Sequence, residues 1–147
     1  MIALIQRVTE AKVVVDNENI GEIQQGLLVF IGIEKNDRQD EVKRLVDKVL
    51  SYRVFADQDD KMNLSVQDIK GGLLIVPQFT LAADTQKGCR PSFSSAAPPQ
   101  EGERLFDEFV QQAKSKYTNI QTGQFGADMK ISLLNDGPVT FLLQVNK

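Results

Sequence analysis

The chain has 147 residues, a formal net charge of -3, 41% hydrophobic and 25% charged residues. That length is typical of one domain, and that composition is typical of a folded globular protein rather than a disordered one. The absence of histidine excludes Ser-His-Asp and Cys-His catalysis and every histidine-based metal site. The single cysteine, Cys89, excludes an intrachain disulfide and a structural zinc cluster. We therefore expect a single domain over residues 1–147, in a reducing cytoplasmic compartment, with no bound metal or cofactor.

The amino-terminal segment, residues 1–7, predicts a first strand rather than a signal peptide, because no basic leader precedes an apolar stretch. The longest apolar run, residues 26–33, is far shorter than the roughly 20 residues of a membrane helix. We expect no membrane insertion. The acidic net charge gives no global positive field, so a nucleic-acid ligand would need a local basic patch.

Aliphatic and β-branched runs predict strands at residues 13–15, 20–23, 27–33 and 73–76. Between Asn36 and Ser51 the apolar residues follow helical spacing, and Asn36 or Asp37 is available to cap that helix. The acidic run at 57–60 is typical of a solvated hairpin loop and lacks the glycine and distal glutamate of a calcium loop.

The second half of the chain predicts another helix and more strands. The helix follows Pro98-Pro99 and should end near Lys116. Strands are expected at 120–125, 129–134 and 139–145, with the turn at 135–138 joining the last two. This is the pattern of a mostly β protein with two helices.

A proline interrupts the apolar strand at Pro77, and two interpretations remain open there. Proline cannot donate to a ladder, so the backbone N–H groups of Gln78, Phe79 and Thr80 can turn into a cavity and stabilise an oxyanion without histidine. Alternatively, the segment is an edge strand with Thr80 on a polar face.

The loop at residues 85–95 carries two cations, Lys87 and Arg90, and no acid. It either wraps a phosphate or a nucleotide, or simply crosses from the strand to the second helix. Cys89 lies beside Arg90 but has no base or partner cysteine, so we interpret it as a bystander thiol.

Two more segments carry alternatives. Gly137-Pro138 forces a tight turn that is suited to a cis peptide bond, or it is ordinary hairpin punctuation. Phe125 and Met129 enclose glycine and alanine, and they form either the wall of an apolar pocket or plain core.

Taken together, these segments resemble the D-aminoacyl-tRNA deacylases of the D-tyrosyl-tRNA deacylase type over essentially the whole chain. Any one motif alone is weak, and it is their order along the chain that makes the resemblance specific. The motifs are IQRV (5–8), GLLV (26–29), KMNLS (61–65), QFTL (78–81), ADT (83–85), RPSFS (90–94), AAPP (96–99), TG (122–123), FGADM (125–129) and NDGPVT (135–140).

The resemblance implies a β-barrel-like α+β domain with two helices, working as a homodimer with the active sites at the interface. It also implies an activity: hydrolysis of the ester that joins a D-amino acid to the 3′-terminal adenosine of a tRNA. Glycine mischarged on tRNA(Ala) is expected to be cleaved as well, because glycine has no side chain to reject.

The resemblance assigns roles to particular residues. Gly137-Pro138 matches a Gly-cisPro motif that one subunit inserts into the active site of the other, where it excludes an L side chain sterically. Arg7 matches the arginine that supports this motif. Catalytic positions match at Gln78, Phe79 and Thr80, adenosine and aminoacyl positions at Phe125 and Met129, and Lys87 and Arg90 are available for tRNA contact.

For the chemical step, Thr80 either attacks as a nucleophile or stands aside while the 2′-hydroxyl of the terminal ribose helps to activate water. The missing histidine favours the second mechanism. Pro77 occupies a position where the family usually has serine, so a hydroxyl at that position is dispensable or absent here. Two alternatives remain: a dimer that binds nucleic acid without hydrolysis, and an esterase that acts on small aminoacyl esters.

Overall fold

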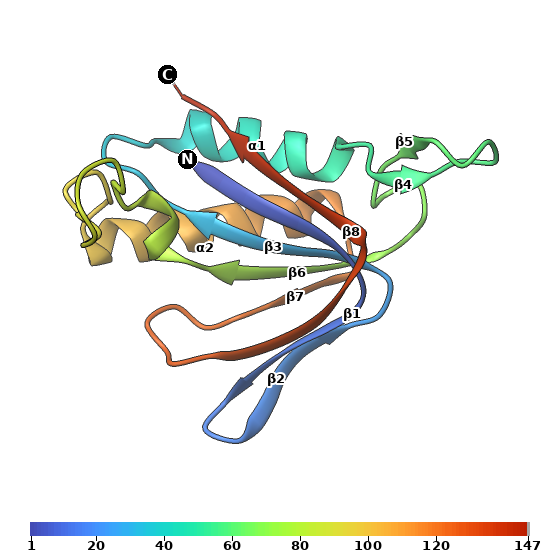
Figure 1. The fold of residues 1–147 in the computed structure, drawn as a ribbon, viewed down its shortest axis with the longest axis horizontal. Helices are drawn as coiled ribbons and strands as arrows, with labels where there is room; N and C mark the ends of the chain where they lie inside the picture. Colours follow the sequence, from blue (N-terminus) through green and yellow to red (C-terminus); the bar gives the residue numbers. More distant parts are fainter. Residues whose placement is uncertain (147) are drawn as a thin grey trace.

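The computed structural model describes residues 1–146 as a curved, mixed six-stranded sheet with two helices on one face (Figure 1). A small two-stranded hairpin lies beside the sheet. In chain order the elements are β1 (Ile2–Val15), β2 (Glu18–Ile23), β3 (Gly26–Gly32), α1 (Gln39–Ser51), β4 (Phe55–Ala56), β5 (Met62–Leu64), β6 (Gly72–Pro77), the 3-10 helix η1 (Phe79–Ala82), α2 (Pro99–Lys116), β7 (Ile120–Thr122) and β8 (Lys130–Gln144).

Strand β1 organises the sheet because three other strands pair with it. Its first half is antiparallel to β3 and its second half to β2, while its other edge pairs with β8 along nearly its whole length. Beyond β3 the sheet continues with β6 and β7, both paired in parallel. At the far edge β2 comes back against β7, so that a Cβ on Gly21 would lie 3.0 Å from the Thr122 carbonyl oxygen. The sheet is thus nearly closed, and the expected barrel-like α+β fold with two helices is confirmed.

Two strand predictions were wrong in the same way. The separate strands expected at 1–7 and 13–15 are one continuous strand, β1. The turn expected at 135–138 is not a hairpin, because β8 continues through these residues without reversing direction. Gln6 pairs with Thr140 and Val8 pairs with Asn135, so residues 136–139 bulge out opposite Arg7 alone. The fold thereby makes an outward corner in the middle of a long strand.

The helices follow the predicted spans closely, but the predicted cap of the first helix was wrong. Helix α1 begins after Arg38, whose amide donates to the Glu41 carboxylate at 2.9 Å. Asp37 instead accepts from the Glu34 amide at 2.7 Å and from the Met1 ammonium at 2.9 Å. Burial raises the pKa of the Asp37 carboxyl. Helix α2 starts at Pro99 and ends at Lys116, as expected.

The hairpin of β4 and β5 encloses the acidic run, as predicted for a solvated loop. The Asp57 carboxylate accepts from the amides of Asp59 and Lys61, so this carboxylate organises a turn. None of the helices within residues 1–146 is long and apolar enough to cross a membrane.

The core has two parts, one on each face of the sheet. The larger part lies between the sheet and the helices, and includes Ile5, Val29, Leu45, Phe109 and Ile75. The smaller part lies within the curl of the sheet, where Met129 and Ile131 pack partly buried against Leu28, Leu74 and Val76. Strands β3 and β6 have residues in both parts of the core, and the candidate site lies at the carboxyl ends of these two strands.

Candidate functional site

The site begins where β6 ends at Pro77. The ladder between β6 and β7 stops at the pair of Ile75 and Thr122. Pro77 lies two residues later, so its missing N–H group does not interrupt that ladder. Beyond Pro77 the chain turns into η1, residues Phe79–Ala82. The strand therefore ends at the proline, as the first interpretation of the sequence expected.

The backbone amides at this turn behave differently from one another. The expectation for Gln78 was wrong, because its amide donates to the Ile31 carbonyl oxygen at 2.8 Å. The amides of Phe79 and Thr80 find no acceptor in the part of the chain that the structure describes, since the first N–H groups of a helix have no intrahelical partner. Two adjacent donors are therefore available to a ligand.

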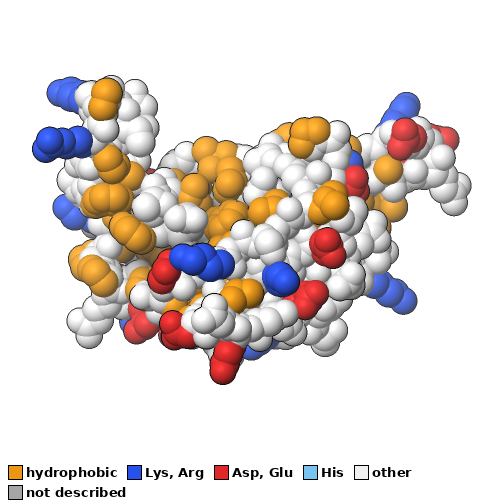
Figure 2. All heavy atoms as spheres, turned by 60° about the horizontal axis from the view of Figure 1, so that its bottom comes forward, with side chains coloured by type: hydrophobic (Ala, Val, Ile, Leu, Met, Phe, Trp, Pro, Cys, Tyr) orange, Lys and Arg blue, Asp and Glu red, His pale blue; other side chains and the backbone are white. Residues whose placement is uncertain are grey.

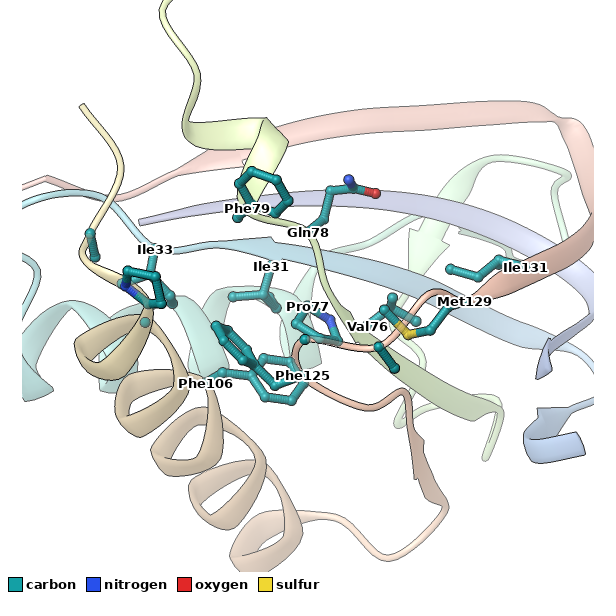
Figure 3. Close-up of a pocket in the computed structure, with 15 residues that line it drawn as sticks. Ile31, Ile33, Val76, Pro77, Gln78, Phe79, Phe106, Phe125, Met129 and Ile131 are labelled. Atoms are coloured by element: carbon teal, nitrogen blue, oxygen red, sulfur yellow. The ribbon is translucent and has the colours of Figure 1, made fainter. Parts of the chain in front are cut away.

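An apolar cavity of about 450 Å³ lies beside this turn (Figure 3). Strand ends, the start of α2 and the segment between β7 and β8 each supply part of its wall. Figure 3 shows Phe79 and Gln78 above the cavity and Phe125, Phe106, Pro77 and Met129 around it. The lining residues are Ile31, Ile33, Val76, Pro77, Gln78, Phe79, Ala97, Pro99, Gly102, Phe106, Phe125, Gly126, Ala127, Met129 and Ile131.

Phe125 and Met129 line the cavity, so they form a pocket wall rather than plain core. The Phe125 ring lies 6.4 Å from that of Phe106 on α2, measured between ring centroids. The Gln124 amide contacts the Met129 sulfur at 3.4 Å, and a Cβ on Gly123 would lie only 2.9 Å from that sulfur. Close packing against backbone thus fixes the thioether in place.

The Thr80 side chain is turned toward Gln78 rather than toward a base. Its hydroxyl accepts a hydrogen bond from the Gln78 side-chain amide, and Thr80 is not among the residues that line the cavity. An amide N–H cannot remove the proton of a hydroxyl, so this contact does not activate Thr80.

The corner at 136–139 is built around a cis peptide bond between Gly137 and Pro138. Arg7 supports it from inside: its Nε donates to the Asp136 carbonyl oxygen at 3.0 Å, and its Nη1 to the Val54 carbonyl oxygen at 2.7 Å. Gly137 has a φ of 132°, a conformation that side chains rarely adopt, so this position requires glycine. The structure thus brings together Arg7, Gly137 and Pro138.

Within one chain, the corner and the cavity are separate. Gly137 and Pro138 are exposed, and neither they nor Arg7 line the cavity. Lys87 and Arg90 lie on an exposed loop whose ends are joined by paired backbone hydrogen bonds between Asp84 and Ser92, at 2.7 and 3.0 Å. Cys89 is exposed on the same loop.

The contribution of α2 to the cavity was not predicted from the sequence. Pro99, Gly102 and Phe106 of this helix line the cavity, as does Ala97 just before the helix. Glycine inside a helix was the available signal, because it costs helix stability and so indicates a packing or functional reason for its presence. A Cβ on Gly102 would lie 3.5 Å from the Phe125 ring.

Comparisons with known proteins place the chain in one family. The family model described as D-Tyr-tRNA(Tyr) deacylase matches residues 4–144. A protein of Saccharophagus degradans named D-aminoacyl-tRNA deacylase is 61% identical over 97% of this chain and 99% of its own length. A protein of the same name from Photorhabdus laumondii is 61% identical over 99% of this chain and 100% of its own.

Two solved structures share the fold. One is described as c-Myc DNA Unwinding Element Binding Protein; it is 39% identical, covers 100% of both chains and superposes with a TM-score of 0.96. The other is described as a probable eukaryotic D-amino acid tRNA deacylase; it covers 98% of both chains with a TM-score of 0.83, and at 16% identity it shows the fold alone. By the family model and these relatives, the chain belongs to the D-Tyr-tRNA(Tyr) deacylase family.

Proposed function

We propose that this chain hydrolyses the ester bond of D-aminoacyl-tRNA, releasing free tRNA and the D-amino acid. Membership of the deacylase family supports the enzyme class. The observation that carries the chemistry is the pair of unpartnered amides, those of Phe79 and Thr80, at the turn after Pro77, where Phe79 lines the apolar cavity. Two adjacent N–H donors of this kind suit the oxygen that becomes negative when an ester carbonyl is attacked.

In this proposal the substrate is held rather than attacked by a side chain. The terminal adenosine occupies the cavity against Phe125 and Met129, which leaves the ester carbonyl at the amides of Phe79 and Thr80. The neighbouring 2′-hydroxyl of the ribose helps to activate a water molecule. Water adds to the carbonyl, the tetrahedral oxyanion is held by the two amides, and the ribose 3′-oxygen leaves with a proton.

Chiral selection, in this proposal, comes from the second subunit of a homodimer. Its Gly137-Pro138 corner enters the cavity mouth, where the corner carbonyls meet the substrate α-amino group and leave no room for an L side chain. The exposed, internally supported corner described above suits that task, and glycine on tRNA(Ala) passes the same filter because it has no side chain. Lys87 and Arg90 are proposed to contact the tRNA.

Exposed leucines support the dimer. Leu142 and Leu134 are 60% and 52% exposed, and both lie on β8, the strand that carries the corner. Figure 2 shows apolar side chains gathered over the middle of the face that it presents. Large exposed apolar residues beside an outward corner are suited to a subunit interface.

The test is deacylation of D-Tyr-tRNA and L-Tyr-tRNA in parallel, at catalytic enzyme concentration and with a metal chelator present. We expect rapid loss of the D-ester alone. Cleavage of both esters would show that the enzyme does not select by chirality. Inhibition by the chelator would show that hydrolysis needs a metal ion. Equal cleavage of a free D-aminoacyl ester would indicate a general esterase instead.

One observation favours a second candidate, a dimer that binds nucleic acid without hydrolysis. The 39% identical structure is named for the binding of a DNA element. The exposed Lys87 and Arg90 would then be the contacts. Retention of tRNA or DNA on the protein, with no ester cleaved, would favour this candidate over the deacylase.

A further inference from the structure

Two aromatic rings lie exposed together outside the cavity. The side chains of Phe79 and Phe93 are 62% and 42% exposed, and their ring centroids are 5.2 Å apart with an interplanar angle of 42°. Phe79 also lines the cavity, whereas Phe93 does not. The pair therefore extends an apolar surface from the mouth of the cavity outward.

The backbone around Phe93 is anchored, so its ring is presented at a defined place. Just before it, Ser92 is joined to Asp84 by two backbone hydrogen bonds of 2.7 and 3.0 Å. Just after it, the Lys35 amide donates to the Ser95 carbonyl oxygen at 2.9 Å. The Ala96 amide donates to the carbonyl oxygen of Phe93 itself at 3.1 Å. A ring that is held in place before binding loses less entropy when a ligand stacks on it.

The charge around the pair indicates which ligand fits. The chain from residue 85 to residue 98 contains Lys87 and Arg90 and no acid. Neither cation forms an ion pair with any residue of the described range 1–146. Figure 2 shows basic and apolar side chains together on the projecting part at its upper left, where the 84–95 loop of Figure 1 lies. Aromatic faces beside unpaired cations are typical of sites for single-stranded nucleic acid.

We propose that Phe93, together with Phe79, stacks on the base of the penultimate nucleotide of the tRNA 3′ end, and that Lys87 and Arg90 neutralise the phosphates preceding it. This inference rests on the proposed function, which places the terminal adenosine in the cavity. It adds a second nucleotide subsite outside the cavity, in which Phe93 is a binding residue with no part in the chemistry. A ring face accepts any base, so the site recognises a single-stranded end rather than a sequence.

The experiment compares two substrates that share the same ester: D-Tyr-tRNA and the 3′-D-tyrosyl ester of adenosine. For Phe93→Ala we expect kcat/KM on D-Tyr-tRNA to fall about tenfold, since one base–aromatic stack is worth that much, and kcat/KM on the adenosine ester to stay unchanged. Phe93→Tyr keeps the ring and should keep the activity. Phe93→Leu keeps an apolar side chain without the ring and should behave as Phe93→Ala does.

A matched control is Met62→Ala, which removes a 49% exposed apolar side chain from β5 in the separate hairpin. It should leave both substrates unaffected. Sedimentation of each variant checks that the oligomeric state is that of the wild type. An equal loss on both substrates, or a change of oligomeric state in Phe93→Ala, would assign Phe93 to the fold or to the subunit interface and overturn the inference.

A tRNA with an abasic penultimate position completes a double-mutant cycle with Phe93→Ala. We expect the abasic substrate to lose about tenfold with the wild type and nothing further with Phe93→Ala, because both changes remove the same stack. Additive losses would overturn the inference. A wild-type enzyme that leaves D-Tyr-tRNA intact would instead overturn the proposed function, so the two failures are distinguishable.

Discussion

At the scale of single residues, Thr80 carries a hydroxyl beside the cavity, yet nothing in its surroundings activates that hydroxyl. Its hydroxyl accepts from the Gln78 side-chain amide, and the chain has no histidine to take its proton. What this position contributes to the site is its backbone N–H, which any residue other than proline retains.

Thr80→Ala should therefore keep kcat for D-Tyr-tRNA within about tenfold of the wild type, whereas removing a true nucleophile costs about 10⁴-fold or more. The measurement is single-turnover deacylation. A well-folded Thr80→Ala variant that loses several orders of magnitude would show that Thr80 takes part chemically.

Arg7 links the corner to the body of the protein through two carbonyl oxygens, those of Asp136 and Val54. Arg7→Met should lower the free energy of unfolding by about 3–6 kcal/mol, because each of its two hydrogen bonds from a charged donor contributes about 1.5–3 kcal/mol. It should also raise hydrolysis of L-Tyr-tRNA relative to D-Tyr-tRNA, because the corner is no longer held from inside.

Urea unfolding and the ratio of the two deacylation rates measure these effects. Arg7→Lys keeps the charge but not the planar set of donors, so it should lie between the wild type and Arg7→Met. A loss of stability with an unchanged ratio of rates would limit Arg7 to a structural role.

At the scale of elements, the sequence predicted both helices and the end of β6, because helical periodicity and a proline are local signals. It misassigned the corner because residues 135–138 have the chemistry of a hairpin turn. Only the pairing of β1 with β8 on both sides of the corner, Gln6 with Thr140 and Val8 with Asn135, distinguishes a bulge from a turn. That pairing joins residues more than a hundred positions apart, which no local pattern encodes.

The cavity shows the same limit. Phe125 and Met129 were predicted as candidates from one short segment, and the structure places both on the cavity wall. The contribution of α2 was missed because its inward residues, Gly102 among them, are spaced like any helix face. The Gln78 amide was misassigned because its acceptor, the Ile31 carbonyl, belongs to a strand far away in the chain.

The start of the parallel pair β3 and β6 provides a prediction at this scale. A Cβ on Gly26 would lie 1.9 Å from the Gly72 carbonyl oxygen, so the two backbones must separate if alanine stands there. Gly26→Ala should lower the free energy of unfolding by more than about 3 kcal/mol or prevent folding, as severe overpacking does. Because both strands end at the cavity, any protein that does fold should also lose activity.

The matched control is Gly102→Ala, where the nearest atom to the new Cβ is 3.5 Å away, in ordinary contact. Alanine in place of a helical glycine should raise stability by about 0.5–1 kcal/mol. Chemical denaturation of both variants is the measurement. A Gly26→Ala variant as stable as the wild type would show that the two strands separate at little cost.

At the scale of the whole molecule, the cavity and the corner are on different parts of one chain, and the proposed enzyme needs both at one site. In the proposed homodimer, each chain would supply a cavity to itself and a corner to its partner. Association and activity should then be lost together.

Leu142→Glu tests that link, since Leu142 is 60% exposed on β8. A buried, unpaired carboxylate is costly, so we expect the variant to sediment as a monomer at micromolar concentration and to lose deacylation of D-Tyr-tRNA. Met62→Glu adds the same charge on the separate hairpin and should sediment and react like the wild type. A monomeric Leu142→Glu with full, D-specific activity would refute the shared site, and a monomeric wild type would refute the dimer.

The unpartnered amides of Phe79 and Thr80 have a practical consequence for inhibitors and for genetics. Reagents that acylate or phosphorylate an activated serine or threonine hydroxyl in hydrolases have no target at these donors, so profiling with such reagents should leave the site unlabelled. Alanine scanning does not detect these donors either, because every residue except proline retains the backbone N–H group. Replacing an amide by an ester in the main chain, or introducing proline at residue 79 or 80, is the change that reaches them.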